Sequence, residues 1–178
     1  QAMSGYLASG TYLKLANNID ASATSGWDAG WGFSPIGNET TKFSGELDGD
    51  DNSITDLKMV RPIAIGLFTG LFGYTAGSAI LSNIRLVDID VNGGSFSGGL
   101  AAYNYGAISN CSASGSLSGG YYTGGLVGIN YGSIANSHAS VTVTAPGNDV
   151  GGLVGQNQGS IIDSYSTGNV LDGTYYIG

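Results

Sequence analysis

The segment GGLVGINYGSIANS, residues 124–137, returns 27 residues later as GGLVGQNQGSIIDS, residues 151–164, with identical residues at ten of fourteen positions. A more divergent copy, GGLAAYNYGAISNC, lies 26 residues earlier at residues 98–111. A repeat length between about 20 and 50 residues is typical of proteins built from stacked structural units. The sequence therefore predicts an array in which each copy packs against the next.

The residues inside one repeat favour strands over helices. No copy contains the long run of helix-forming residues at 3.6-residue spacing that a helical repeat needs, whereas short apolar segments separated by Gly, Asn and Ser are typical of strands and turns. Three apolar columns recur in register: Leu100, Leu126 and Leu153; Ile108, Ile134 and Ile161; and Leu117, Val143 and Val170. We expect an all-β parallel β-solenoid (β-helix) of about three strands per coil, with a period of 26–27 residues and coils about 4.8 Å apart.

Polar residues also recur at one position of the repeat. Asparagines occupy one column, each two residues before a glycine: Asn104, Asn130 and Asn157, followed by Gly106, Gly132 and Gly159. Stacked amide side chains can bond from coil to coil, so we expect an asparagine ladder; the alternative is that each Asn is an ordinary turn residue. We expect the glycines to adopt positive φ at a corner.

Composition limits the classes of partner. The chain has 13 acidic and five basic residues, a net charge of −8, and no Lys or Arg after Arg85. Nucleic acids and anionic lipids both require clusters of basic residues, so neither is an expected partner. The single cysteine, Cys111, excludes an internal disulfide framework. It shares a column with Ser137 and Ser164 and lacks electropositive neighbours, so we expect it to be structural and unreactive.

The repeat pattern suggests one continuous domain in two parts. Residues 1–63 form an irregular N-terminal β part leading into the solenoid, and residues 64–178 form the regular coils. The chain stops at Gly178, where the next Gly-Gly-Leu would begin, so the last coil would lack a capping unit. We therefore interpret the sequence as a fragment of a longer protein.

Two features of the N-terminal part admit a structural and a functional interpretation. Trp27, Trp31 and Phe33 either line a binding surface or belong to a loop folded over the side of the first coils, which we favour because such rings bury well. A run of oxygen-bearing side chains that could hold Ca²⁺ follows at Asp48, Asp50, Asp51 and Asn52. The run lacks the glycine and closing glutamate of a twelve-residue calcium loop, so a solvated turn is favoured and no cofactor is expected.

An uncharged stretch at residues 64–84 has the composition of a membrane span. Its Gly-Leu-Phe-Gly at residues 70–73 mirrors the Gly-Leu-Val-Gly of the repeats, so we interpret the stretch as an early coil and expect no membrane insertion. Residues 84–91 then alternate strictly between apolar and polar, which predicts a long strand with Arg85, Asp88 and Asp90 directed outward.

Aromatic residues gather at the corner before each Gly-Gly, at Phe96, Tyr121, Tyr122, Tyr175 and Tyr176. If exposed, this aromatic strip can stack on sugar rings or on a protein partner, such as a host or bacterial surface glycan or protein. The alternative is local packing at the corner, since Tyr suits both roles.

The pattern Gly-Gly-Leu-Val-Gly-x-Asn-x-Gly-Ser-Ile at residues 124–134 and 151–161 resembles the GLUG motif. That motif occurs in large bacterial surface exoproteins and in the non-catalytic part of immunoglobulin A-cleaving metallopeptidases. Segments such as residues 43–49 are similar to those that precede the repeats in filamentous-haemagglutinin-like adhesins. The resemblance implies a right-handed β-helix in a secreted cell-surface protein that reaches the surface by two-partner secretion through an outer-membrane transporter. The His-Glu-x-x-His zinc motif of the metallopeptidases is absent.

Catalysis would require a group of acids and bases on one exposed face. Two carboxylate pairs are spaced for one side of a strand, Glu46 with Asp48 and Asp88 with Asp90. The regular coils contain no Lys or Arg to act beside them, and His138 has no evident orienting partner, so we expect a surface histidine and no enzyme.

These features favour a rigid stalk with an adhesion surface, used in cell attachment, biofilm formation or host contact. The alternatives are a polysaccharide-binding or polysaccharide-cleaving β-helix, and the non-catalytic scaffold of a secreted metallopeptidase.

Overall fold

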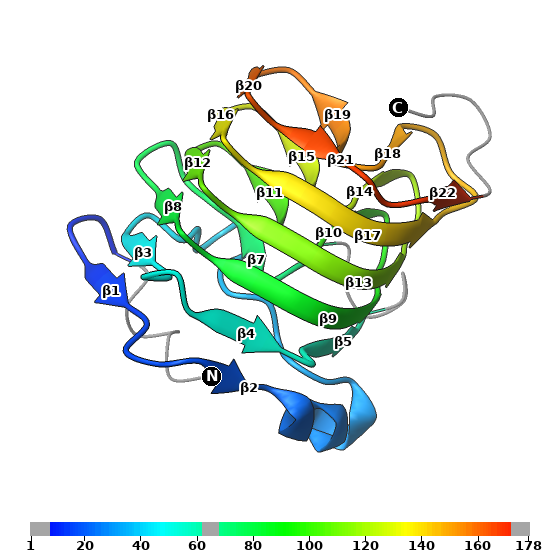
Figure 1. The fold of residues 1–178 in the computed structure, drawn as a ribbon, viewed down its shortest axis with the longest axis horizontal. Helices are drawn as coiled ribbons and strands as arrows, with labels where there is room; N and C mark the ends of the chain where they lie inside the picture. The colour runs from blue at the N-terminus through cyan, green and yellow to red at the C-terminus, as the bar shows by residue number, and fades with distance from the viewer. Residues whose placement is uncertain (1–7, 62–67, 172–178) are drawn as a thin grey trace.

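The computed structural model describes residues 8–61 and 68–171, which wind into a parallel β-solenoid (Figure 1). The all-β fold class predicted from the repeat is confirmed. The coils rise from β1 and β2 near the N-terminus to β19–β22 near the C-terminus, and each strand pairs in parallel with a strand one coil away.

Four parallel sheets run along the solenoid. Sheet I contains β1 (Tyr12–Lys14), β3 (Glu46–Asp48), β8 (Ile80–Ser82), β12 (Ala107–Ser109), β16 (Ser133–Ala135) and β20 (Ser160–Ile162). Sheet II contains β2 (Ile19–Asp20), β4 (Ser53–Thr55), β9 (Arg85–Asn92), β13 (Ser112–Ser118), β17 (His138–Thr144) and β21 (Tyr165–Ser166), with β5 (Lys58–Val60) on β9 and β22 (Val170–Leu171) on β17. Sheet III contains β7 (Phe72–Tyr74), β11 (Ala101–Asn104), β15 (Val127–Asn130) and β19 (Val154–Asn157). Sheet IV contains β6 (Phe68–Thr69), β10 (Phe96–Gly98), β14 (Tyr122–Gly124) and β18 (Val150–Gly151).

A regular coil therefore consists of four strand segments, as in β10, β11, β12 and β13. This is one more than the three apolar columns indicate. The Gly-Gly-Leu segment bends between β10 and β11 and so divides one side of the coil into two short strands. Leu100 lies in this bend and is fully buried.

The predicted register of the apolar columns is present in the structure. Ile108 pairs with Ile134, which pairs with Ile161, and Leu117, Val143 and Val170 align in the same way. In the leucine column, the backbone nitrogen of Leu100 donates to the Leu126 carbonyl oxygen, and that of Leu126 donates to Leu153, each at 2.9 Å. Leu100 and Leu126 are fully buried, and these stacked side chains form the core.

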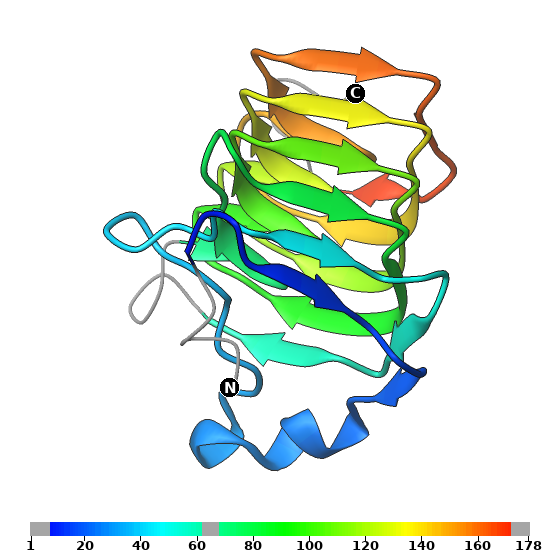
Figure 2. The same ribbon diagram turned by 90° about the vertical axis from the view of Figure 1, so that its left-hand side faces the viewer.

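The aromatic N-terminal segment crosses the N-terminal end of the solenoid (Figure 2). Two short 3-10 helices, η2 (Ser22–Gly26) and η3 (Asp28–Gly30), lie below the first coils. The segment after them attaches to β5, where the Phe33 nitrogen donates to the Lys58 carbonyl oxygen at 2.8 Å. The expected loop over the side of the first coils is thus mainly a cover on their end.

The glycines of the Asn-x-Gly corner are needed for space, and the prediction of positive φ there is wrong. Gly106, Gly132 and Gly159 all lie outside the left-handed region. A methyl group at Gly132 would overlap the carbonyl oxygen of Gly106 in the coil below, and one at Gly159 would overlap that of Gly132. Glycine therefore permits close stacking of successive coils.

Positive φ occurs instead at the next corner, in a column of Asn83, Asn110, Asn136 and Asp163 with φ between 48° and 56°. Asn and Asp tolerate this conformation better than other non-glycine residues. Positive φ also interrupts β9 at Asp88 (φ 54°), where the register with β13 shifts. Arg85, Asp88 and Asp90 are exposed as expected, but the strict alternation predicted for residues 84–91 is wrong because of this bulge.

The apolar stretch of residues 68–84 forms β6, β7 and β8, while residues 64–67 lie outside the described part of the chain. The helical segments within residues 8–61 and 68–171 have neither the length nor the hydropathy of a membrane span.

Candidate functional site

The asparagine column forms a continuous ladder inside the solenoid. Asn104 Nδ2 donates to Asn130 Oδ1, and Asn130 Nδ2 donates to Asn157 Oδ1, each at 2.8 Å. Thr75 Oγ1 extends the chain by one coil, donating to Asn104 Oδ1 at 2.9 Å. Asn104 and Asn130 are fully buried, so this ladder is part of the core and leaves no amide for a ligand at those two positions.

Seven aromatic rings form one cluster on sheets III and IV and the following corner. This aromatic cluster consists of Phe68, Tyr74, Phe96, Tyr103, Tyr105, Tyr122 and Tyr131. On sheet IV, Phe96 stacks on Phe68 and on Tyr122 with centroid distances of 5.2 and 5.1 Å. At the corner, Tyr105 and Tyr131 stack at 4.7 Å.

The orientation of the rings limits what the aromatic cluster can bind. The Phe96 and Tyr122 rings are within 3° of parallel, so neighbouring rings cover each other's faces. Sugars bind aromatic side chains by packing on a ring face, and here the interior rings of each stack present mainly their edges. Burial raises the pKa values of Tyr74 and Tyr103, which shows that this part of the cluster is packed.

The predicted aromatic strip is divided by the structure. Phe96 and Tyr122 belong to the stacked cluster, whereas Tyr121 is 54% exposed. Tyr121 borders a shallow groove of about 300 Å³ whose other lining residues are Gly93, Gly119, Gly120, Pro146 and Gly147. Tyr175 and Tyr176 lie outside the described residues.

Sequence reasoning missed most of the cluster. Tyr105 and Tyr131 each precede the glycine of the Asn-x-Gly corner, so the alignment of the repeats contains the signal that pairs them. Tyr74 and Tyr103 pair in register between β7 and β11 and stack at 4.8 Å. They are 29 residues apart, outside the regular period, and the repeat alone does not align them.

The acidic run of the calcium candidate forms a hydrogen-bonded turn. Asp48 Oδ1 accepts from Asn83 Nδ2 at 2.9 Å and from the Asp50 nitrogen at 2.8 Å. Asp50 forms an ion pair with Lys14 at 2.9 Å, and both Asp50 and Asp51 have positive φ. Asn52 Nδ2 donates to backbone carbonyl oxygens. In the described ranges, no three His, Cys, Asp or Glu side chains are grouped to hold a metal ion.

The two carboxylate pairs are engaged elsewhere. The side-chain hydrogen bond from Asn83 is the main cause that lowers the pKa of Asp48, so this carboxyl is an ordinary anion rather than a proton donor near neutral pH. Asp90 forms an ion pair with Lys58 at 2.8 Å. Asp88 lies on the bulge that separates it from the regular pairing of Asp90. Neither pair lines the pockets described here.

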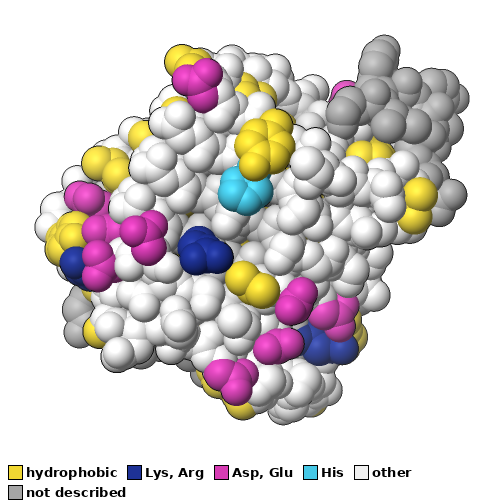
Figure 3. Space-filling model, in the orientation of Figure 1, with side chains coloured by type: hydrophobic (Ala, Val, Ile, Leu, Met, Phe, Trp, Pro, Cys, Tyr) yellow, Lys and Arg dark blue, Asp and Glu magenta, His cyan; other side chains and the backbone are white. Residues whose placement is uncertain are grey.

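The outer face of sheet II carries hydroxyl side chains, with few charges near its centre (Figure 3). In register, Arg85 is followed by Ser112, His138 and Tyr165, one coil apart. The His138 and Tyr165 rings stack at 5.2 Å. Within the described residues His138 has no carboxylate partner of the kind that orients a catalytic base.

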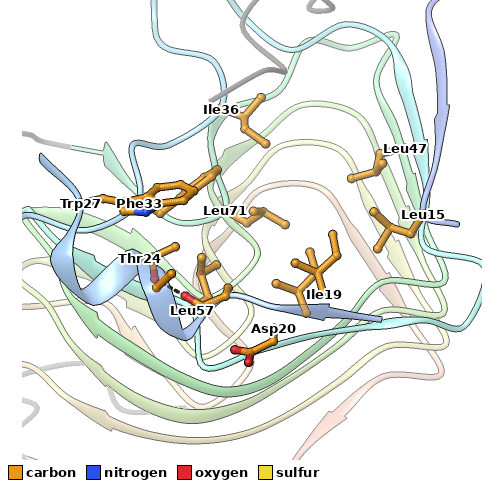
Figure 4. Close-up of a pocket in the computed structure, with 13 residues that line it drawn as sticks. Leu15, Ile19, Asp20, Thr24, Trp27, Phe33, Ile36, Leu47, Leu57 and Leu71 are labelled. Carbon is orange, nitrogen blue, oxygen red and sulfur yellow. Dashed lines mark hydrogen bonds between the residues drawn. The ribbon is translucent and has the colours of Figure 1, made fainter. Parts of the chain in front are cut away.

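An apolar pocket of about 170 Å³ lies at the N-terminal end of the solenoid (Figure 4). Its walls include Leu15, Leu47 and Leu71 from the coils and Trp27 and Phe33 from the covering segment. Asp20 is its one lining carboxylate. The pocket therefore offers hydrophobic contact but no pair of acid and base.

The stacked register and the buried amide ladder define a repeat protein of the parallel β-solenoid class. Residues 93–118, 119–144 and 147–171 match the family model "The GLUG motif", so this part of the chain is a GLUG repeat region, as the sequence predicts.

Two relatives share this repeat region. Halomucin of Haloquadratum walsbyi is 34% identical over 114 residues, which cover 62% of this chain and 1% of halomucin. A "Putative Gly-rich membrane protein" of Evansella cellulosilytica is 36% identical over 110 residues, which cover 60% of this chain and 12% of the relative. The chain thus spans only a small part of either relative.

The fold also occurs in a solved structure. The crystal structure of "a putative immunoglobulin A1 protease" from Bacteroides ovatus superposes with a TM-score of 0.69, covering 99% of this chain and 67% of that chain. The two sequences are 21% identical, so the likeness extends to the fold alone.

Proposed function

We propose that this chain is a non-catalytic solenoid segment of a secreted cell-surface protein, where it serves as a rigid stalk and as a surface for attachment to cells. The observation that carries the proposal is the uninterrupted register of the buried columns, including the ladder from Asn104 to Asn157. Stacked repeats of this kind form stiff rods with long faces suited to many weak contacts.

A surface location is supported by the relatives, one of which is named a membrane protein. The resemblance to filamentous-haemagglutinin-like adhesins adds export by two-partner secretion through an outer-membrane transporter. The irregular N-terminal part and the repeat coils act as one continuous domain in this proposal, because sheets I and II run through both.

Labelling of intact cells of the source organism tests the location and the role together. Antibodies raised against residues 93–171 are expected to label intact cells, and deletion of these residues is expected to reduce attachment to a surface. Labelling that requires permeabilised cells would contradict a surface location. Unchanged attachment of the deletion strain would contradict the adhesive role.

Polysaccharide binding is a second candidate, favoured by the exposed Tyr121 ring beside its groove. A glycan array compares the parent chain with Tyr121→Ala and with Tyr165→Ala, a control of similar exposure at 57% on sheet II. Loss of binding in Tyr121→Ala alone would support the groove as a binding site. Equal binding by all three proteins would remove it.

Two alternatives involve hydrolysis by this chain or by a partner domain. Incubation with acidic polysaccharides is expected to yield no unsaturated products, and their appearance would establish a lyase. A role as the non-catalytic scaffold of a secreted metallopeptidase agrees with the same fold, and a zinc-binding peptidase domain in the same reading frame would favour it over the adhesin.

A further inference from the structure

A short loop projects from the side of the stacked coils between residues 37 and 42, drawn in light blue at the left of Figure 2. Its ends are fixed to the coil above, because Ile36 bridges to Phe72 and Phe43 bridges to Thr75. Ile36 and Phe43 are buried, with 7% and 0% exposure. The loop is therefore a protrusion on a rigid base.

The loop contains an acceptor sequence for N-linked glycosylation. Asn38, Glu39 and Thr40 form the pattern Asn-x-Thr, in which the asparagine nitrogen receives the sugar. All three residues are exposed. A modifying enzyme can therefore reach the asparagine and the threonine together.

Hydrogen bonds hold the Asn38 side chain by its oxygen. Asn38 Oδ1 accepts from the backbone nitrogens of Thr40 and Thr41 at 3.0 and 2.8 Å. The Asn38 backbone nitrogen donates to the Thr41 carbonyl oxygen at 2.9 Å and closes the loop. Asn38 Nδ2 donates to no atom of residues 8–61 and 68–171, so the reacting nitrogen is available.

A second Asn-x-Ser sequence provides an internal comparison. Asn110, Cys111 and Ser112 have the same pattern, but they lie at a corner inside the stack. Asn110 Nδ2 donates to Asn83 Oδ1 at 3.3 Å, and Cys111 is 1% exposed. Ser112 begins β13, which is paired on both sides. This second sequence cannot enter an enzyme site without unstacking the coils.

We propose that Asn38 is a site of N-linked glycan attachment, an inference that rests on the export proposed above. The donor is an oligosaccharide joined through its anomeric carbon to a lipid pyrophosphate. Asn38 Nδ2 forms a bond to that carbon while the bond from the carbon to the pyrophosphate oxygen breaks. The lipid pyrophosphate leaves with the electron pair, and the amide loses one of its two protons to a base of the transferase.

The attached glycan would leave the solenoid next to the aromatic cluster. Lys42, at the end of the same loop, places its Nζ 4.7 Å from the Tyr74 ring centroid and 5.2 Å from that of Tyr105. Because the loop lies outside the coils, attachment changes no strand pairing. We therefore expect the modified protein to keep the fold.

A transfer assay tests the site directly. The folded chain is incubated with lipid-linked oligosaccharide and a purified oligosaccharyltransferase that accepts the minimal Asn-x-Ser/Thr sequence, and the product is weighed by mass spectrometry. The expected result is addition of one glycan, on the peptide that contains Asn38. Asn38→Asp, which keeps an oxygen acceptor for the loop, and Thr40→Ala are expected to abolish the addition, while Thr40→Ser retains it.

The unfolded chain is the control for accessibility and is expected to accept glycan at Asn110 as well. No transfer to the folded chain, transfer that persists in Asn38→Asp, or transfer at Asn110 of the folded chain would each overturn the proposal. The assay does not depend on where the protein resides in the cell. Its failure is therefore distinct from a failure of surface labelling, which would count against export.

Discussion

Asn104 and Asn130 are joined by a 2.8 Å hydrogen bond between their side chains, although 26 residues separate them in sequence. Both side chains are 0% exposed, so water does not compete for the bond. Asn130 repeats the contact with Asn157. Each amide therefore acts as donor toward one coil and acceptor toward the other, which couples three coils through their interior.

Replacing the central amide is expected to destabilise the solenoid. Asn130→Ala leaves Asn104 Nδ2 without its Asn130 partner and removes the bond to Asn157, and we expect a loss of about 1–3 kcal/mol in the free energy of unfolding. Urea denaturation of both proteins measures the change. Asn157→Ala, at the exposed end of the ladder, is the control and should lose less. Equal losses in the two variants would contradict a role for burial.

The glycine of the Asn-x-Gly corner should not tolerate a methyl group. We expect Gly132→Ala to cost about 1–3 kcal/mol of unfolding free energy, because its Cβ would overlap the Gly106 carbonyl oxygen. Gly77→Ala is the matched control, since its nearest neighbour, the Tyr105 carbonyl oxygen, is 4.0 Å away. If thermal unfolding shows the two variants to be equally stable, close approach of the coils is not the reason for glycine at this corner.

Cys111 should be chemically silent in the folded protein. Burial raises the pKa of its thiol to about 12, so almost no thiolate is present at pH 8. We expect an aromatic disulfide reagent at pH 8 to leave Cys111 unmodified in the native state and to modify it fully in denaturant. Rapid modification under native conditions would show that the corner opens or that the thiol is exposed.

Acid should weaken the contact between β3 and the corner that follows β8. The hydrogen bond from Asn83 is the main cause that holds the pKa of Asp48 below its ordinary value of 3.8. A group with a lowered folded pKa adds stability above its unfolded pKa and loses it as the pH falls through the folded pKa. We expect the parent to lose stability below about pH 4 more steeply than Asp48→Asn, as measured by urea denaturation at several pH values. Parallel pH profiles would contradict this.

Repetition explains why the fold was predictable from sequence. Side chains one period apart lie directly above one another, so the alignment of Leu126 with Leu153 in sequence is also their contact in space. The asparagine column follows the same rule. Where the period fails, so does the prediction: the 29-residue step from Tyr74 to Tyr103 concealed a stacked pair.

Backbone conformation was less predictable than register. A glycine satisfies either a positive φ or a crowded neighbour, and sequence alone does not distinguish them. At Gly132 crowding is the reason, while positive φ falls on Asn136. The bulge at Asp88 was hidden because apolar and polar residues still alternate around it. The Asn38 loop carries no repeat signal, since it lies outside the coils.

Site-directed crosslinking tests the central claim, that residues one period apart lie side by side. Ser116 pairs with Thr142 in register between β13 and β17, so their Cα atoms are expected about 5 Å apart, within the range that a disulfide spans. In a Cys111→Ser background, Ser116→Cys with Thr142→Cys is expected to form an intramolecular disulfide on mild oxidation. The offset pair Ser114→Cys with Thr144→Cys should remain reduced. Crosslinking of the offset pair with no reaction of the aligned pair would contradict the stacked-coil account.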